Sequence, residues 1–415
     1  MTRIGAPNLK EILKRGSITI LLGTGGVGKT TVAAALGIAG AAAHLNTAVI
    51  TVDPAKRLRD ALGLAHLGGK PVRIGAKRLR DAGLHGDLKL SAMVLDVKGA
   101  WDAVAERLAA NPAARERILN NPFYKSLSSE FAGSEAFAAL QQLYDLHQTG
   151  AFELEIVDTP PAAHAFEFIE APARLMRLLD SRAARWIFTP SLSAGRIAAR
   201  FAGEAARFVV RELERFAGGG VLSTISDFFS AAAEGIDAIV DRLKKTEALL
   251  HSNAVTFVLV TTAEADRLRQ ARDLMREMDA DGLRLGAIVV NRFLDERTWS
   301  SAAQGGDALG HLEEIPEVRA RLSEKSPAAG ALAGYLENYG ERTLADVARL
   351  SRFAHELPPG IELAIAPELD SGIGDLAALK RVADFITSGA AILKPLADAA
   401  RRMRPHPAHA KHSRG

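Results

Sequence analysis

The sequence has 415 residues, of which 48% are hydrophobic and 24% are charged, a composition typical of a globular protein with enough apolar material for a core. It contains no cysteine, which excludes disulfides, thiolate catalysis and any zinc or As(III) site built from cysteines. The net charge of +3 arises in residues 401–415, which hold five Lys or Arg and no acid. The remaining chain therefore carries a net charge of −2, which gives little support to nucleic-acid binding.

The N-terminal part of the chain predicts no membrane insertion. Residues 1–16, a predicted extension, lack the apolar segment and cleavage site of a signal peptide, so we expect a cytoplasmic protein. The stretch Thr31–Ile50 has twenty residues without a charge, which is the length of a membrane span. However, it contains His44 and Asn46 and is otherwise rich in Ala and Gly. We predict a buried helix that leads into a strand.

A phosphate-binding loop is predicted at Gly23–Thr31. It fits the pattern G-x-x-x-x-G-K-[ST] and lies between an apolar β-type run and an Ala-rich helical stretch, the context that this motif requires. Glycines let backbone N–H groups surround phosphate oxygens, Lys29 is suited to reach the β- and γ-phosphates, and Thr30 is suited to ligate Mg²⁺. The predicted nucleotide-binding residues of the loop are Gly25, Gly26, Val27, Gly28, Lys29, Thr30 and Thr31.

Short β-rich runs separated by helical patterns indicate a parallel sheet with crossover helices. Residues 98–150 and 163–251 contain amphipathic helical patterns without a convincing strand, and we predict helical insertions there. A single domain over residues 17–400 would contain both insertions, followed by a disordered basic tail at 401–415. The predicted strands are Ile18–Leu22, Thr47–Val52, Lys89–Asp96, Leu154–Asp158, Thr256–Thr262, Gly286–Asn291 and Ile361–Ala366.

Polar residues end three of these strands, and ligands bind at the carboxyl ends of strands in open α/β sheets. Asp158 is a candidate to hold Mg²⁺, although an acid here can also cap a helix. Asp53 can orient or deprotonate an attacking water, and a turn residue before proline is its alternative. The Asn291 amide suits the edge of adenine, while a hydrogen-bonded turn residue is the alternative. His164 is either a switch element or an exposed residue at a helix start.

With these residues together, the chain resembles the arsenical-pump ATPase family, which includes the ATPases that target tail-anchored membrane proteins. The resemblance covers roughly residues 15–385 and is carried by four segments in order: Gly23–Thr31, Asp53-Pro54-Ala55, Asp158–His164 and Asn291. It implies an α/β P-loop NTPase with a mainly parallel sheet flanked by helices, and a separate helical layer formed by the insertions. It also implies ATP and Mg²⁺ as cofactors, Asp53 and Lys29 as catalytic residues, Thr30 and Asp158 at the metal, and Asn291 and Pro367 at the nucleotide.

Two positions, Thr24 and Ala163, and the lack of cysteine depart from the family pattern. Thr24 stands where the family usually has a lysine that reaches across the dimer to the partner's nucleotide. Loss of such a charge removes a stabiliser of the transition state that can be worth about 10³-fold or more. Lys56 or Arg57 could replace it, since both follow the Asp53 segment. Ala163 replaces the glycine that usually precedes His164, and the missing cysteines exclude the family's As(III) and zinc sites.

Two functions of different classes remain. The first is an ATPase switch, a homodimer or a heterodimer with a paralogue, that acts on an apolar protein client or a membrane partner. It is motivated by apolar stripes within residues 197–243, which buried packing would also explain. The second is a slow-turnover regulatory or scaffolding switch controlled by ATP occupancy, which Thr24 favours. A surface-positioning ATPase with a C-terminal membrane helix is the weakest alternative, because the basic tail has no apolar face beside it.

Overall fold

The computed structural model describes residues 9, 12–52, 56–129, 134–159, 169–173, 176, 221–293, 316, 320, 342, 345–368 and 375–388. Every structural statement below concerns these residues. Several predicted features lie outside them: Asp53, Ala163, His164, the apolar stripe within 197–216 and the tail at 401–415.

An eight-stranded sheet forms the centre of the molecule, in the order β3-β4-β2-β5-β1-β6-β7-β8. All neighbouring pairs are parallel except β3 with β4, which is antiparallel. The predicted mainly parallel sheet is therefore confirmed, with all seven predicted strands present and one additional edge strand, β3. The strands are β1 (Ser17–Leu22), β2 (Thr47–Thr51), β3 (Val72–Arg73), β4 (Leu90–Val94), β5 (Leu154–Asp158), β6 (Val255–Thr261), β7 (Leu285–Val290) and β8 (Glu362–Ile365).

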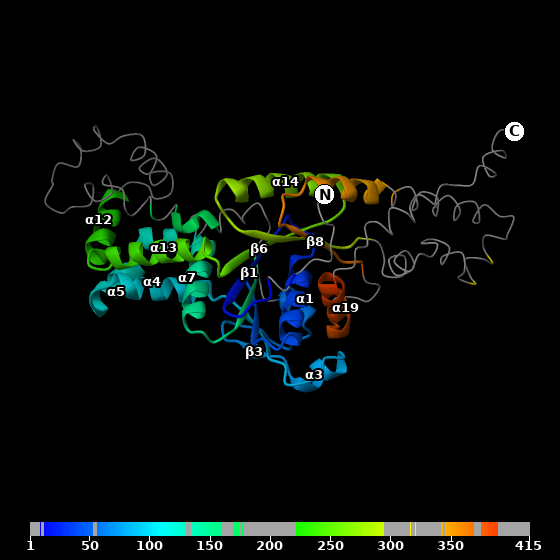
Figure 1. Ribbon diagram of the computed structural model, residues 1–415. Helices are drawn as coiled ribbons and strands as arrows, with labels where there is room; N and C mark the ends of the chain where they lie inside the picture. The colour runs from blue at the N-terminus through cyan, green and yellow to red at the C-terminus, as the bar shows by residue number, and fades with distance from the viewer. Residues whose placement is uncertain are drawn as a thin grey trace.

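Both faces of the sheet are covered by helices (Figure 1). Because successive side chains of a strand point to opposite faces, each strand contributes to two separate cores. On β1, Ile18 and Ile20 belong to one core, while Leu21 belongs to the other. The central strands β1, β2 and β5 are buried along their whole length, and this includes polar residues such as Thr19, Thr47 and Glu155.

One face packs against α1 (Lys29–Ala42) and α19 (Leu376–Ser388), which lie side by side in Figure 1. Small residues let α1 approach the sheet closely. A Cβ added at Gly37 would lie 2.2 Å from Val49 Cγ2, and one at Gly40 would lie 2.5 Å from Leu154 Cδ2. The charge-free stretch is thus a buried helix followed by β2, as predicted, and no helix among the described residues is long and apolar enough to cross a membrane.

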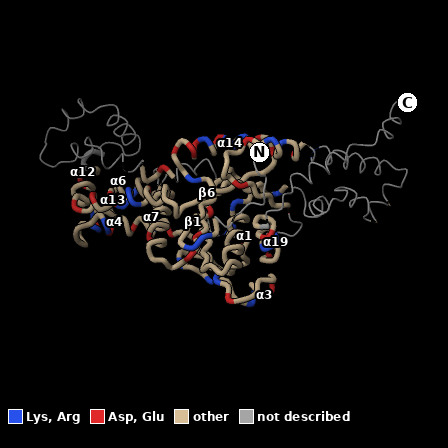
Figure 2. The backbone as a smooth tube through the Cα atoms, viewed as in Figure 1, with Lys and Arg blue, Asp and Glu red and all other residues tan. Residues whose placement is uncertain are grey.

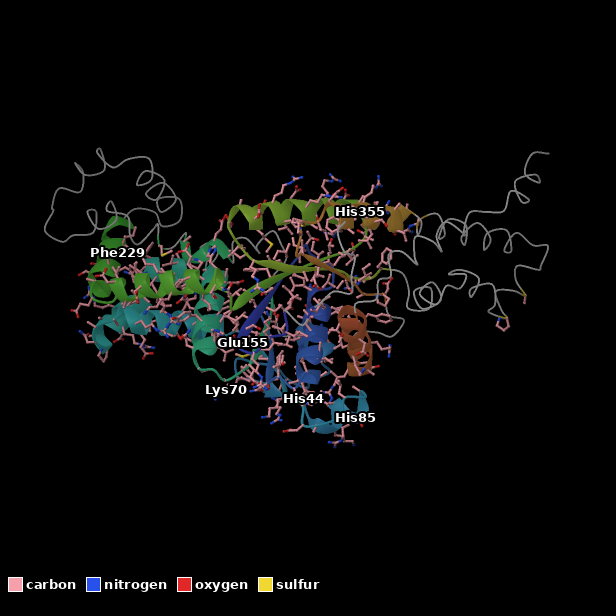
Figure 3. All side chains as sticks on the ribbon, in the orientation of Figure 1. His44, Lys70, His85, Glu155, Phe229 and His355 are labelled. Atoms are coloured by element: carbon pink, nitrogen blue, oxygen red, sulfur yellow. The ribbon has the colours of Figure 1, made fainter. Side chains whose placement is uncertain are left out.

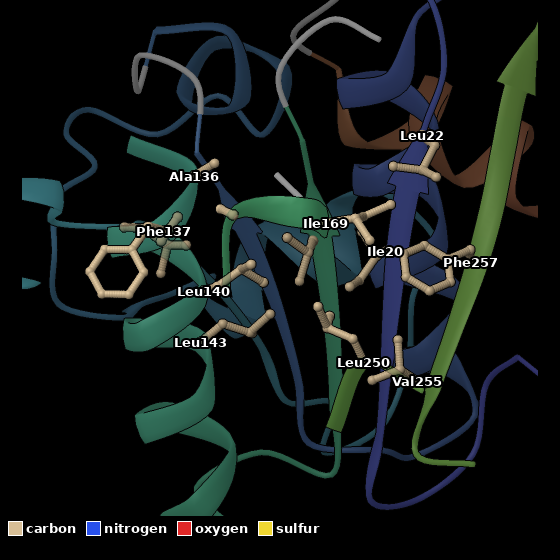
Figure 4. Packing of buried hydrophobic residues seen from close by; sticks show 14 of the residues in the cluster. Ile20, Leu22, Ala136, Phe137, Leu140, Leu143, Ile169, Leu250, Val255 and Phe257 are labelled. Atoms are coloured by element: carbon tan, nitrogen blue, oxygen red, sulfur yellow. The ribbon is translucent and has the colours of Figure 1, made fainter. Parts of the chain in front are cut away.

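The opposite face carries the helical layer, defined here as α4, α5, α6, α7, α12 and α13, which lies to the left of the sheet in Figure 1. Its core joins aromatic rings from distant segments: Trp101 contacts Tyr124 and Phe137, and Phe123 contacts Phe228. Figure 4 shows Phe137, Leu140 and Leu143 of α7 in the same apolar cluster as Ile20 and Phe257 of the sheet. The bounds are α4 (Val97–Leu108), α5 (Pro112–Asn120), α6 (Pro122–Ser129), α7 (Ser134–Gln148), α12 (Val221–Ala232) and α13 (Ile236–Leu250).

The apolar stripe of α12 and α13 is packed core where it is described. Five of its residues are buried: Ile225, Phe228, Phe229, Ile239 and Leu243. Burial against the other helices explains their helical spacing without a partner. Packing, the alternative reading of this stripe, is therefore correct for the described part.

The remaining helices are α2 (Lys56–Ala61), α3 (Ala76–Asp81) and α14 (Ala265–Ala280). Figure 2 shows Lys and Arg interleaved with Asp and Glu along α14. Arg272 of this helix pairs with Glu356 at 2.6 Å and so joins α14 to the helical segment 345–356. The surface of α14 therefore carries both signs of charge.

Candidate phosphate-binding site

The loop between β1 and α1 has a backbone that depends on glycine. Gly26 and Gly28 have φ of 82° and 88°, in the left-handed region that other residues rarely adopt. A Cβ at Gly23 would lie 2.3 Å from the Val260 carbonyl oxygen of β6, so only glycine fits there. Helix α1 begins at Lys29, directly after Gly28, and its N-terminal N–H groups face the loop region. The loop therefore curls at the helix start as the sequence motif predicts.

Lys29 and Thr30 are held by specific partners. The Lys29 side chain is buried, and its Nζ donates to the Gly23 carbonyl at 2.9 Å and to the Thr24 carbonyl at 3.5 Å. The Thr30 hydroxyl donates to Asp158 Oδ2 at 2.7 Å, and the Thr51 hydroxyl is 3.3 Å from the same oxygen. The loop, β5 and β2 thus meet at one carboxylate.

The strand register explains this meeting. Asp158 at the end of β5 pairs with Leu21 of β1 on one side and with Thr51 of β2 on the other. The next residue, Thr159, donates its hydroxyl to the Leu21 carbonyl. Because these strands are parallel, their carboxyl ends fall at one edge of the sheet, where the loop also starts.

A pocket of about 430 Å³ opens beside the loop. Its lining combines backbone N–H groups of a glycine loop, three hydroxyls, two carboxylates and three basic side chains, a chemistry suited to a phosphate chain with a cation. Arg57 lies among the lining residues and Lys56 does not. The lining residues are Gly25, Gly26, Gly28, Lys29, Thr30, Thr31, Arg57, Asp60, Ala61, Asp158, Thr159 and Arg292.

Asn291 and Arg292 follow β7 and touch the same loop from the other side. The Asn291 amide, 3% exposed, donates through Nδ2 to the Val27 carbonyl at 2.9 Å. The exposed Arg292 donates through Nη1 to the Gly26 carbonyl at 3.4 Å. The structure therefore places Asn291 beneath the loop, one residue from a basic side chain that lines the pocket.

The oxygen atoms at this site are suitable ligands for a magnesium ion. A threonine hydroxyl and a carboxylate oxygen 2.7 Å apart are hard oxygen ligands, the type that Mg²⁺ selects when it also binds phosphate. No group of three or more His, Cys, Asp or Glu that could hold a metal by itself occurs in the described part of the chain. The site therefore suits a metal that arrives with its phosphate ligand.

The structure thus brings together most of the predicted loop residues and Asp158, while Asp53 lies outside the described residues. Pro367 is buried beyond the end of β8 and does not line the pocket. Sequence reasoning missed Thr51, Asp60 and Arg292. The rule that polar residues at strand ends converge would have found Thr51 and Arg292, because each lies within one or two residues of a predicted strand end.

In this mainly parallel α/β sheet, the first strand leads through a glycine loop into a helix. Lys and Thr stand at the helix start, and Asp lies on the adjacent strand. This arrangement defines the P-loop nucleotide-binding class. Within that class, residues 17–306 match the family described as Anion-transporting ATPase, and the chain belongs to this family. The family expectation drawn from the sequence motifs is confirmed.

Curated relatives agree with this assignment at low identity. The ATPase GET3 of Malassezia globosa is 25% identical over 290 residues, which cover 69% of this chain and 76% of that protein. The ATPase get3 of Aspergillus terreus is 23% identical over 322 residues, 75% of this chain and 85% of the relative. The Aspergillus niger protein of the same name is 22% identical over 322 residues, which also cover 75% of this chain and 85% of that protein.

Proposed function

We propose that the chain hydrolyses ATP with Mg²⁺ and uses the reaction to switch the conformation of a dimer. The observation that carries the proposal is the contact between Thr30 and Asp158 at 2.7 Å, at the mouth of a pocket lined by the glycine loop and Lys29. Membership of an ATPase family and relatives named ATPase GET3 support the same reaction.

Each side chain then has a distinct role. The loop from Gly25 to Thr31 surrounds the phosphates with N–H groups, and Lys29 exchanges its carbonyl partners for phosphate oxygens. Thr30 and Asp158 would hold Mg²⁺, which would neutralise negative charge on the phosphate chain. Asp53 orients or deprotonates the attacking water. Asn291 and Pro367 belong to the base end of the site.

The decisive experiment is phosphate release by the purified full chain with ATP and Mg²⁺, compared with Lys29→Ala and Asp53→Asn. We expect measurable turnover that both substitutions abolish, with ATP still bound by Asp53→Asn. Tight ATP binding without turnover by the wild-type chain, even with candidate partners present, would instead establish the alternative, a slow-turnover regulatory or scaffolding switch.

Arg57 is our candidate for the cation that Thr24 does not supply. It lines the same pocket as Asp158 and comes from α2, whereas its neighbour Lys56 is not a lining residue. A charge in this pocket acts on the γ-phosphate, where negative charge shifts during hydrolysis.

A matched pair of variants tests Arg57. Arg57→Ala should lower kcat by about 10²–10³-fold while leaving the affinity for ATP within a few-fold, the signature of an interaction made in the transition state. Lys56→Ala removes a neighbouring exposed charge and should leave kcat unchanged. Equal effects of the two substitutions would show that general electrostatics, and not Arg57, is responsible.

For the biological role we propose a cytoplasmic homodimer, or a heterodimer with a paralogue, that drives or regulates a membrane-related client or partner. Purification of Asp53→Asn with ATP, recording oligomeric state and bound proteins, tests this role. Because the described apolar residues of α12 and α13 are buried, client binding through them requires the helical layer to open. A monomer under these conditions, with ATP bound, would contradict the dimeric switch.

A further inference from the structure

We infer that Asn291 and Arg292 act as a clamp that aims the backbone N–H groups of the phosphate-binding loop into the pocket. The inference rests on the proposed nucleotide site and adds two positioning residues to it. It gives Asn291 a role on the phosphate side of the site, in addition to the base end where the sequence alone placed it.

The clamp consists of two consecutive residues that hold two consecutive carbonyls. Asn291 Nδ2 donates to Val27 O at 2.9 Å, and Arg292 Nη1 donates to Gly26 O at 3.4 Å. These contacts join the end of β7 to a loop more than 260 residues away in the sequence. They also connect two strands, β7 and β1, that are separated in the sheet by β6.

Because a peptide unit is planar, holding its carbonyl also fixes the direction of its N–H group. In a trans peptide the C=O and the N–H of one unit point in opposite directions. A carbonyl of Gly26 held toward β7 therefore turns the Val27 N–H away from β7, and a held Val27 carbonyl does the same for the Gly28 N–H. Gly26 and Gly28 both line the pocket, so the peptide units held by the clamp lie in the part of the loop that borders it. Orienting these donors before binding reduces the entropy lost when phosphate binds.

The corner after β7 is built rigidly enough to act in this way. Arg292 has a φ of 55°, a conformation that costs free energy in any residue with a side chain. Backbone bonds on both sides maintain it: Asn291 N–H donates to Thr261 O at 2.8 Å, and Phe293 N–H donates to Ala366 O at 2.9 Å. Phe293 is also buried, which anchors the corner in the core.

The loop and the clamp fit each other sterically. A Cβ placed on Gly28 would lie 2.2 Å from Asn291 Nδ2, so the amide occupies the space that a side chain at Gly28 would need. Glycine at this position is therefore required twice, once for its φ of 88° and once for the amide beneath it.

Binding of Mg²⁺–tripolyphosphate, a phosphate chain without a base, separates the clamp from base recognition. Asn291→Ala should weaken tripolyphosphate and ATP alike, by about tenfold, the size expected when a buried carbonyl loses its donor. If the substitution weakens ATP but leaves tripolyphosphate unchanged, Asn291 serves only the base and the clamp is wrong.

Substitutions of Arg292 separate its guanidinium from its backbone. Arg292→Gly relieves the strained φ but removes the donor, and should weaken tripolyphosphate by about two- to threefold, since the bond is long and exposed. Arg292→Lys retains a donor and should restore most of the affinity. Arg284→Ala, which removes an exposed arginine at the other end of β7, is the matched control and should bind as the wild type does. Equal binding by Arg292→Gly and the control would exclude Arg292 from the clamp.

Hydrogen exchange of the loop in the nucleotide-free chain is a measurement that does not depend on ligand. Amides of residues 23–31 should exchange faster in Asn291→Ala than in the wild type or Arg284→Ala, while the strands keep their protection. Unchanged exchange would overturn the clamp even if binding changes. If the wild-type chain binds neither ATP nor tripolyphosphate, the proposed function fails, and the exchange result still decides whether the clamp exists.

Discussion

The phosphate-binding loop and the helical layer are stabilised by opposite means. At the loop, short contacts between polar groups hold a backbone that is unfavourable by itself, as at Gly28 and Arg292. In the helical layer, rings from distant segments such as Trp101, Tyr124 and Phe228 exclude water from one another. A substitution in one region should therefore change ligand binding with little loss of stability, and a substitution in the other should do the reverse.

The largest expected effect is at Lys29. Lys29→Ala removes the cation whose Nζ is held by the Gly23 carbonyl, and should reduce ATP turnover by at least about 10³-fold. The free energy of unfolding in the absence of nucleotide should change by less than about 1 kcal/mol, because the Nζ bonds to the Gly23 and Thr24 carbonyls lie within the loop itself. Phosphate release and urea unfolding measure the two quantities. A large loss of stability would show that the loop is also a structural element.

The converse test is at Phe137, whose ring contacts Trp101 in the core of the helical layer. Phe137→Ala should lower the free energy of unfolding by about 3–5 kcal/mol, because it leaves a cavity among buried side chains. Affinity for ATP, measured where the variant is still folded, should remain within a few-fold of wild type. A matched loss of affinity would mean that the layer and the loop are coupled even without a partner.

Gly37 lies on α1, the helix that starts at the loop, where this helix packs against β2. A Cβ there would meet Val49 Cγ2 at 2.2 Å, so Gly37→Val should destabilise the chain by about 1–3 kcal/mol through overpacking. Thermal unfolding measures this loss. Combining Gly37→Val with Val49→Ala should recover part of the lost stability. If no stability is recovered, the overpacking does not arise at the contact with Val49.

The smallest effect concerns a buried pair that joins α7 to the sheet. His147 Nδ1 lies 3.0 Å from Glu155 Oε2, and Figure 3 shows Glu155 on the central strand beside this helix. Hydrogen bonding to Glu155 raises the pKa of His147, and burial raises the pKa of Glu155. The folded chain therefore retains protons that the unfolded chain releases, so the free energy of unfolding falls as the pH rises above about 6.5, the ordinary pKa of histidine.

Glu155→Gln should flatten this dependence by at most about 1.4 kcal/mol per pH unit, the value for one proton. The slope is measured by urea unfolding at several pH values between about 6 and 8, the range in which histidine titrates. His147→Gln should flatten it similarly, since each substitution removes the same pair. A slope unchanged in both variants would assign the pH dependence to other groups.

The same contrast explains what the sequence could predict. The loop, Asp158 and the buried strands were predictable because each depends on a local pattern: a fixed spacing of glycines and lysine, or an apolar run such as that of β7. The two-residue strand β3 was missed because Val72 and Arg73 are not fully buried and form no pattern. Local sequence does not contain the partner of a side chain, so it placed Asn291 at the edge of adenine but did not reveal its bond to the Val27 carbonyl.

Which of two neighbouring cations reaches the pocket was also beyond the sequence. Lys56 and Arg57 have the same charge and adjacent positions, and only the direction in which α2 leaves the sheet selects Arg57. Likewise, Arg292 follows a predicted strand but its positive φ is set by the backbone bonds to β6 and β8. Such choices depend on tertiary contacts that no short segment records.

The short strand β3 limits how copies of this protein can assemble. It lies at one end of the sheet, pairs over two residues only, and carries Arg73, which is 3.7 Å from Asp87. An edge this short and charged offers little backbone for another chain to pair with, and so discourages end-to-end growth into a continuous sheet. In the proposed dimer, a second copy is therefore expected to contact this edge through side chains rather than by adding a strand to β3.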